Sequence, residues 1–171
     1  MHLTLAGRLA YTRARMQPHS NLTESYAAQA YELEQLISKA SAETIILQPG
    51  ENRWSILQIA CHLADAELLA SLRIRRIITE DTAKLWSYQQ EVWADRLSYQ
   101  QRKIGTVITR FALLRRENAE LLTGLPDAVW DQTGEHDEYG VLSLRQLIED
   151  YVVHTAKHLR QIEKLTSFKN Q

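Results

Sequence analysis

Apolar residues recur at the three- and four-residue spacing of an α-helix in four long segments of the chain. These segments run from about residue 22 to 42, from 55 to 79, from 98 to 124 and from 143 to about 165. In each segment the apolar positions form one stripe, which a helix can bury against its neighbours. Only six glycines and three prolines occur in the 171 residues, so long helices are favoured over short strands. The pattern predicts an all-α fold, an up-down four-helix bundle with long connections after helices 2 and 3.

Two of these helices begin with the same local signal. Ser55 and Ser143 can each accept a hydrogen bond from the backbone three residues later, where Gln58 and Gln146 complete a capping box. The third helix meets Gly124 at its end, as helices commonly do. We therefore expect the second and fourth helices to start at these serines and the third to end at the glycine.

The two long connections lack a helical stripe. Residues 80–96 are polar apart from Trp86, Tyr88 and Trp93, and we expect a loop or short helix whose aromatic side chains turn inward. These aromatic rings could wall an apolar pocket, or they could equally fill the core or a dimer contact. Residues 127–142 are expected to form a long irregular loop, because they show neither helical nor strand periodicity.

The length of the chain suits a single domain. We predict a bundle domain over residues 21–171 and a basic lead-in over residues 1–20. The lead-in carries Arg8, Arg13 and Arg15 and no acidic residue, a composition also found in organellar transit peptides. We interpret it as a strand or short helix packed on the outside of the bundle.

The charges of the chain nearly cancel, with 20 Lys and Arg against 21 Asp and Glu and a net charge of −1. This balance gives no reason to expect a nucleic-acid or membrane partner, and no apolar run approaches the ~20 residues that span a bilayer. The single cysteine, Cys61, excludes an intramolecular disulfide and favours a cytoplasmic location. We interpret Cys61 as a small packing residue that points away from the buried stripe of its helix.

Two histidines interrupt the apolar stripe of the fourth helix. His154 and His158 are four residues apart, which places them one turn apart on the same helical face. That face also carries Leu147, Tyr151 and Ile162, so both imidazoles should be buried. A buried imidazole must be neutral and either hydrogen-bonded or bound to a metal ion.

A third histidine, His62, leans toward the buried side of the second helix beside Ile59 and Ala66. Packing of the second helix against the fourth could bring His62 to His154 and His158. Three neutral imidazoles leave coordination positions open on a zinc-like ion, which is the ligand count of a catalytic site. We therefore predict a divalent-metal site made by these three side chains.

Other interpretations of the histidines stay open at this point. A buried histidine is often an ordinary core residue with a hydrogen-bond partner, and pairs at four-residue spacing arise by chance. Two other kinds of metal bundle are excluded, because the chain has neither the Glu-x-x-His pairs of di-iron proteins nor a His-Glu-x-x-His motif.

At these residues the chain resembles the DinB-like superfamily of metal-dependent enzymes, which includes the YfiT-like proteins and thiol-dependent S-transferases. The resemblance is carried by the segments Trp54–Glu67, Thr133–Ile148 and His154–Ile162. It implies a four-helix bundle, frequently a homodimer, with one divalent ion such as zinc, nickel, iron or manganese on His62, His154 and His158. Many members have another histidine just before the last ligand, where this chain has Lys157, whose side chain should face outward.

The resemblance leaves the reaction open. The ion could activate water, which gives a hydrolase, or a low-molecular-weight thiol, which gives an S-transferase acting on a small-molecule substrate. An alternative is a non-catalytic, stress-related bundle that binds a metal or ligand. A purely structural homodimer with hydrogen-bonded histidines is a further alternative.

Four residues could assist at such a site. Asp65, Glu67 and His136 are candidate catalytic residues, and Asp150, one turn before His154, could accept the distal N–H of that imidazole. The acids could equally be solvated helix surface, and His136 could be an exposed loop residue. We expect the site near the end of the bundle where the loop containing His136 crosses, since an active ion must be reachable from solvent.

Overall fold

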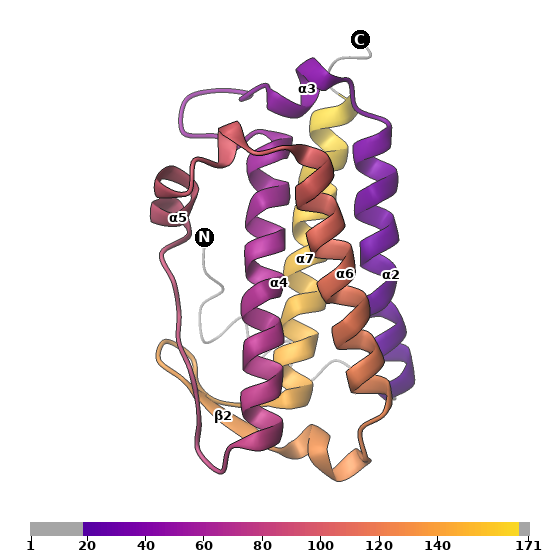
Figure 1. Ribbon diagram of the computed structural model, residues 1–171, viewed down its shortest axis with the longest axis vertical. Coiled ribbons are helices and arrows are strands. Elements are labelled where there is room, and N and C mark those ends of the chain that lie inside the picture. The colour runs from indigo at the N-terminus through magenta and orange to yellow at the C-terminus, as the bar shows by residue number, and fades with distance from the viewer. Residues whose placement is uncertain (1–18, 168–171) are drawn as a thin grey trace.

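The computed structural model describes residues 19–167, and in this range four long helices pack into a bundle (Figure 1). The four-helix bundle predicted from the sequence is confirmed, and so are its two long connections. One short helix lies between the first and second long helices, and another lies in the first long connection. The helices are α2 (His19–Ser38), α3 (Ala42–Ile46), α4 (Ile56–Thr79), α5 (Gln90–Arg96), α6 (Ile104–Thr123) and α7 (Leu144–Ser167).

The long connection after α4 runs back along the bundle, so α6 starts at the same end as α4 (Figure 1). Contacts between these two helices follow a parallel order, with Asp65 against Arg110 and Arg75 against Glu117. Helices α2 and α7 run in the opposite direction. The order along the chain is therefore up, down, down, up, which corrects the predicted up-down alternation, and α4 is antiparallel to α7.

The helix starts follow the capping signals closely. Ser55 and Gln58 form the predicted capping box before α4, and Ser143 exchanges the same pair of bonds with Gln146 before α7. The third helix begins at Ile104, later than predicted, because Ser98 adopts a left-handed φ of 52° and a 3₁₀ turn follows it. At the N-terminus α2 already includes residues 19 and 20, and the rest of the predicted lead-in lies outside the described residues.

The two long connections contain a small three-stranded sheet, which corrects the expectation of an irregular loop over residues 127–142 and adds a strand to the loop or short helix expected over residues 80–96. Strand β2 (Thr133–His136) pairs in parallel with β1 (Ala83–Leu85) and antiparallel with β3 (Gly140–Ser143). Strands of three or four residues are too short to show a two-residue periodicity. The sheet packs on α4 at Gly134, where an added Cβ would lie 2.9 Å from Leu85 and 3.1 Å from Ile77.

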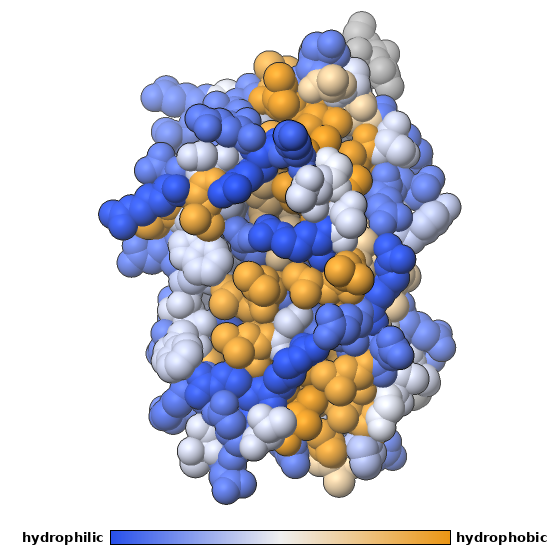
Figure 2. Space-filling view, viewed as in Figure 1, coloured by the Kyte–Doolittle hydropathy of each residue, from blue (hydrophilic) through white to orange (hydrophobic). Residues whose placement is uncertain are grey.

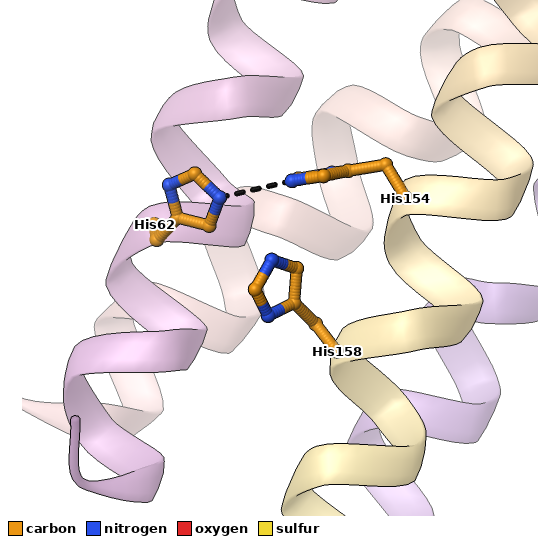
Figure 3. Close-up of side chains that lie close together, drawn as sticks. All are labelled: His62, His154 and His158. Atoms are coloured by element: carbon orange, nitrogen blue, oxygen red, sulfur yellow. Dashed lines mark hydrogen bonds between the residues drawn. The ribbon is translucent and has the colours of Figure 1, made fainter. Parts of the chain in front are cut away.

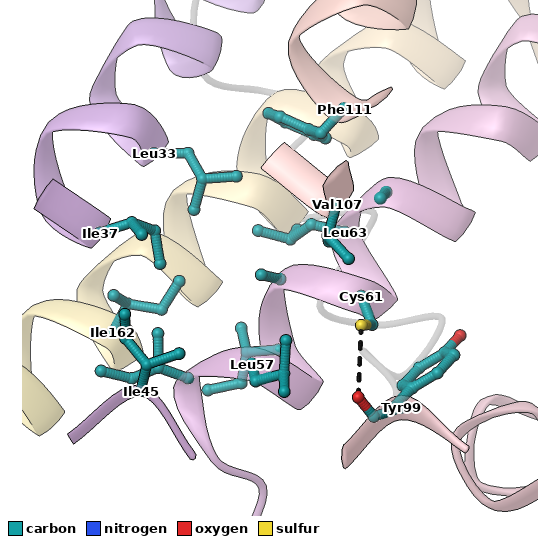
Figure 4. Close-up of a cluster of buried hydrophobic side chains, with 14 of the residues drawn as sticks. Leu33, Ile37, Ile45, Leu57, Cys61, Leu63, Tyr99, Val107, Phe111 and Ile162 are labelled. Atoms are coloured by element: carbon teal, nitrogen blue, oxygen red, sulfur yellow. Dashed lines mark hydrogen bonds between the residues drawn. The ribbon is translucent and has the colours of Figure 1, made fainter. Parts of the chain in front are cut away.

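The core consists of two clusters stacked along the bundle, one of which is drawn in Figure 4. Cys61 belongs to the cluster in Figure 4 and donates a weak S–H hydrogen bond to the carbonyl of Tyr99 at 3.8 Å. Its predicted packing role is confirmed. The side chain is buried because the segment around Tyr99 folds over this side of α4.

We expect the Cys61 thiol to resist alkylation and disulfide exchange in the folded protein. The side chain is only 2% exposed, and burial raises its pKa to about 12, so little thiolate forms at pH 8. A colorimetric thiol assay should detect less than about one tenth of a thiol per native chain and a full equivalent after unfolding in guanidinium. Rapid reaction of native protein would contradict this burial.

The outer faces of α4 and α6 carry exposed apolar side chains (Figure 2). Leu68 and Leu72 on α4 are 47% and 48% exposed, and Leu113 on α6 is 64% exposed. These leucines therefore add little to the bundle core. Among the described residues, no helix has the length and apolar character that a membrane crossing requires.

Candidate metal centre

The three predicted histidines converge between α4 and α7 (Figure 3). One ring nitrogen from each of His62, His154 and His158 lies within 4.8 Å of the other two. The Nε2 atoms of His62 and His154 are 3.0 Å apart, although 92 residues separate them in the chain. The antiparallel packing of α4 against α7 thus brings His62 to the two histidines of α7.

All three imidazoles are neutral at physiological pH. Burial lowers the pKa of His62 to about 3 and that of His158 to about 4, and it lowers the pKa of His154 well below its usual value. The neighbouring imidazoles lower the pKa values of His62 and His154 further, because adjacent positive charges repel. Neutral rings keep the lone pairs that a metal ion requires.

Outer hydrogen bonds fix two of the rings. The Nδ1 atom of His62 lies 3.0 Å from the hydroxyl of Tyr88, and Nδ1 of His158 lies 3.1 Å from the side-chain oxygen of Gln161. If each Nδ1–H donates to its oxygen partner, the Nε2 lone pair faces the other histidines. This is the arrangement that commonly orients metal-binding histidines.

The donor set fits a divalent ion. Nitrogen ligands at ~2.0–2.1 Å from zinc in a tetrahedron lie roughly 3.3 Å from one another. The 3.0 Å separation of His62 and His154 and the 4.8 Å limit for the whole group bracket that value. Within residues 19–167 these three histidines are the group of side chains whose ligand atoms could meet at one ion. Three nitrogen ligands leave at least one coordination position for another ligand.

Aromatic rings lie beside His62, one from just before α4 and the others from the long connection after it. The rings of Trp54 and Tyr88 lie 5.2 Å and 6.3 Å from the His62 ring, and Trp93 packs 4.6 Å from Tyr88. The expectation that Tyr88 and Trp93 turn inward is borne out by these contacts, whereas Trp86 is 61% exposed. Lys157, in the turn between the two histidines of α7, is exposed as the resemblance implied.

The location of the cluster along the bundle differs from the prediction. His62 lies in the second turn of α4, whereas β2, which carries His136, packs near Ile77 at the opposite end of this helix. His136 itself is 4% exposed rather than an exposed loop residue. Its ring stacks on Tyr139, and its Nδ1 accepts a hydrogen bond from the backbone N–H of Glu138. It is not part of the metal-binding group.

The candidate catalytic acids of α4 are buried in structural contacts. Asp65 accepts a hydrogen bond from the Tyr99 hydroxyl at 2.5 Å and pairs with Arg110. It therefore attaches the segment before α6 to α4. The alternative of a solvated helix surface is wrong for Asp65, because its side chain is 4% exposed.

Glu67 lies in the centre of the bundle and is fully buried. Its carboxylate pairs with the buried Arg115 at 2.9 Å and accepts hydrogen bonds from Asn118 and Tyr26. The Arg115 guanidinium also donates to Thr155, next to His154 in α7. These contacts connect α2, α4, α6 and α7, so Glu67 helps to set how the four helices pack together.

Asp150 is half-buried on α7 one turn before His154, so its role as acceptor for that ring stays a prediction. Tyr88 and Gln161 were missed as partners of the histidines. Gln161 lies three residues after His158 on the same helical face, a spacing that could have identified it. Tyr88 comes from the long connection, and no local spacing relates it to His62.

We expect Tyr88→Phe to weaken metal binding about tenfold or more, because the His62 ring loses the oxygen that orients it. Competition with a chromophoric chelator measures the affinity directly. Tyr31→Phe is the matched control, since Tyr31 is 65% exposed on α2. Equal affinities in all three proteins would show that Tyr88 does not position the ring.

Three neutral histidines from two facing helices form a candidate metal centre inside this bundle. The chain is therefore a helical-bundle protein with a candidate metal site between its helices. Residues 25–162 match the model of the DinB superfamily, which covers well over half of the chain. The chain belongs to the DinB superfamily, and the resemblance noted in the sequence is confirmed.

Two bacterial proteins are similar to the chain in sequence. A protein of Oceanobacillus iheyensis, named as a candidate metal-dependent hydrolase, is 28% identical over 117 residues, which cover 68% of this chain and 67% of that protein. A protein of Halalkalibacterium halodurans with the same description is 25% identical, over 67% of this chain and 66% of that protein. The match thus spans about two thirds of each relative's length.

The solved structure of YfiT from Bacillus subtilis, described as having an unusual four-helix bundle topology, superposes with a TM-score of 0.83. The match covers 90% of each chain at 18% identity, and it establishes the fold.

Proposed function

We propose that this protein is a metal-dependent hydrolase that acts on a small molecule, using one divalent ion held by His62, His154 and His158. The observation that carries the proposal is the convergence of three neutral imidazole rings between two helices. The names of the relatives, candidate metal-dependent hydrolases, support it.

The chain's own residues would prepare the site before any substrate arrives. Neutral histidines present lone pairs without first releasing a proton, so binding of the ion is favourable at neutral pH. Gln161 and Tyr88 hold two of the rings in the orientation that faces the third. When bound, a divalent ion supplies Lewis acidity, which lowers the pKa of a water molecule or thiol beside it.

The Tyr88 hydroxyl can bond to Nδ1 of His62 whether or not that nitrogen carries the proton. Burial raises the pKa of its hydroxyl, so the group stays protonated at neutral pH. It can accept the Nδ1–H of His62 while its own proton remains available as a donor. Trp54 packs against the His62 ring and Trp93 against the Tyr88 ring, so aromatic side chains border this part of the site.

The test combines metal loading with a hydrolysis screen. Protein stripped with a chelator is reloaded separately with zinc, nickel, manganese or iron(II) and assayed on small esters and amides. We expect turnover that depends on the ion, disappears with chelator and returns on reloading. The His62→Ala variant, treated identically, should remain at background. Equal rates in that variant would overturn the proposal.

A thiol S-transferase is the competing reaction at the same three histidines, because a metal ion activates a thiol as well as water. The same loaded protein is therefore incubated with an alkyl halide electrophile in the presence and absence of a low-molecular-weight thiol. Metal-dependent consumption of the thiol without ester or amide hydrolysis would assign the transferase reaction. Metal binding with neither reaction would favour a non-catalytic binding protein.

A further inference from the structure

Arg73 lies on the side of α4 that carries His62. Residues 62, 66, 69 and 73 follow a four-three-four spacing, which places them on one helical face. At 1.5 Å per residue, about 16 Å of helix axis separates His62 from Arg73. Side chains lean toward the N-terminus of their helix, so the Arg73 side chain extends toward His62.

The guanidinium of Arg73 contacts neutral groups. Nη1 donates a hydrogen bond to the Tyr151 hydroxyl at 3.0 Å, and Nη2 donates to the backbone carbonyl of Trp86. Nε is buried and has no hydrogen-bond partner among the described residues. Tyr151 precedes His154 by three residues on α7, so this contact lies on the same face of α7 as the histidines.

The other two arginines of α4 are compensated by carboxylates. Arg75 pairs with Glu117 at 2.5 Å, and Arg76 pairs with Glu80 at 2.8 Å. No carboxylate within residues 19–167 forms an ion pair with Arg73. Arg73 is thus a half-buried cation without an anionic partner in the part of the chain that the structure describes.

A partly desolvated cation favours the binding of an anion. The guanidinium matches a carboxylate, because its Nε–H and one Nη–H can donate two parallel hydrogen bonds. The Tyr151 hydroxyl accepts its bond from Arg73, which leaves its own O–H free to donate to the same carboxylate. A substrate that reaches from the histidines to Arg73 would therefore be held at both ends.

We propose that Arg73, with Tyr151, binds a carboxylate of the substrate while the reacting group lies at the three histidines. This carboxylate subsite rests on the proposed function and assigns it a substrate class, small carboxylic acids whose reacting group is several bonds from the carboxylate. Arg73 acts here in binding and specificity, and the reaction itself is left to the histidine site.

Two matched hydroxamates test the subsite by binding rather than by activity. Each has a six-methylene chain with a metal-binding hydroxamate at one end, and the other end is a carboxylate in one probe and a carboxamide in the other. Their affinities for the zinc-loaded protein are measured by calorimetry. We expect the carboxylate probe to bind about tenfold or more tightly, as for a charge-assisted hydrogen-bond pair.

Variants separate the subsite from general charge effects. In Arg73→Gln the preference for the carboxylate should fall to about onefold, with the affinity of the carboxamide probe retained. Arg73→Lys should keep part of the preference, and Arg75→Gln, on another face of α4, should keep it fully. Circular dichroism and zinc content establish that each variant is folded and loaded.

Two kinds of result would overturn the subsite, and they can be told apart. Equal affinities of the two probes for the wild type, or an unchanged preference in Arg73→Gln, would refute the subsite and leave the metal site intact. Failure of both probes to bind, or of the wild type to hold zinc, would refute the proposed function and the subsite with it.

Discussion

Replacing His154 with alanine is expected to remove most of the metal from the purified protein. The wild type should carry close to one divalent ion per chain, held by three imidazoles, and the variant retains two of them on different turns and helices. Loss of one of three ligands should lower the affinity for the ion at least about tenfold, because the metal-binding group contains no further side chain that could replace the lost imidazole. Elemental analysis after gentle purification gives the stoichiometry.

The matched control for this result is His136→Ala. His136 is also a buried histidine, but it lies in β2 and does not belong to the group. The control should keep the full complement of metal, and circular dichroism should show helical content in both variants. Equally low metal in the wild type and in His154→Ala would refute the metal site.

Replacing the buried Arg115 is expected to cause a large loss of stability. Arg115→Met leaves the Glu67 carboxylate buried without its cation, and breaking a buried pair in this way costs about 3–5 kcal/mol. The guanidinium also stacks on the Tyr26 ring at 3.9 Å and donates to Thr155, contacts that the variant loses. Urea unfolding followed by circular dichroism measures the change in free energy of unfolding.

A neighbouring arginine supplies the comparison. Arg116 pairs with Glu34 at 3.4 Å, and these side chains are 68% and 40% exposed. Arg116→Met should change the free energy of unfolding by no more than about 1 kcal/mol, because water screens the pair. Adding Glu67→Gln to Arg115→Met should restore part of the lost stability, since the unpaired charge is then removed. Similar effects of Arg115→Met and Arg116→Met would show that the buried pair is unimportant for stability.

The sequence predicted those parts of the molecule that depend on local spacing. Helices α4 and α7 start where Ser55 and Ser143 place them, because a capping box involves residues only three apart. The metal-binding group could be predicted because His154 and His158 lie on an apolar stripe and His62 leans toward the buried side of its own helix. Their convergence then required only that the two stripes face each other.

The missing parts depend on contacts between distant segments. The pairing of β1 with β2 joins residues about fifty positions apart, and neither short strand has a recognisable pattern of its own. The burial of Asp65 and Glu67 depends on Arg110 and Arg115 of α6, whose alignment with α4 the sequence does not specify. Tyr88 likewise reaches His62 only because the connection after α4 runs back along the bundle.

The separation of His62 and His154 by 92 residues has a consequence for the unfolding of the chain. An ion bound to both would act as a reversible cross-link, and joining segments so far apart greatly restricts the conformations open to an unfolding chain. Since only the folded chain brings these ligands together, free metal would favour it by mass action. Resistance to unfolding should therefore rise logarithmically with free metal concentration above the dissociation constant, so that thermal stability itself reports how much metal surrounds the protein.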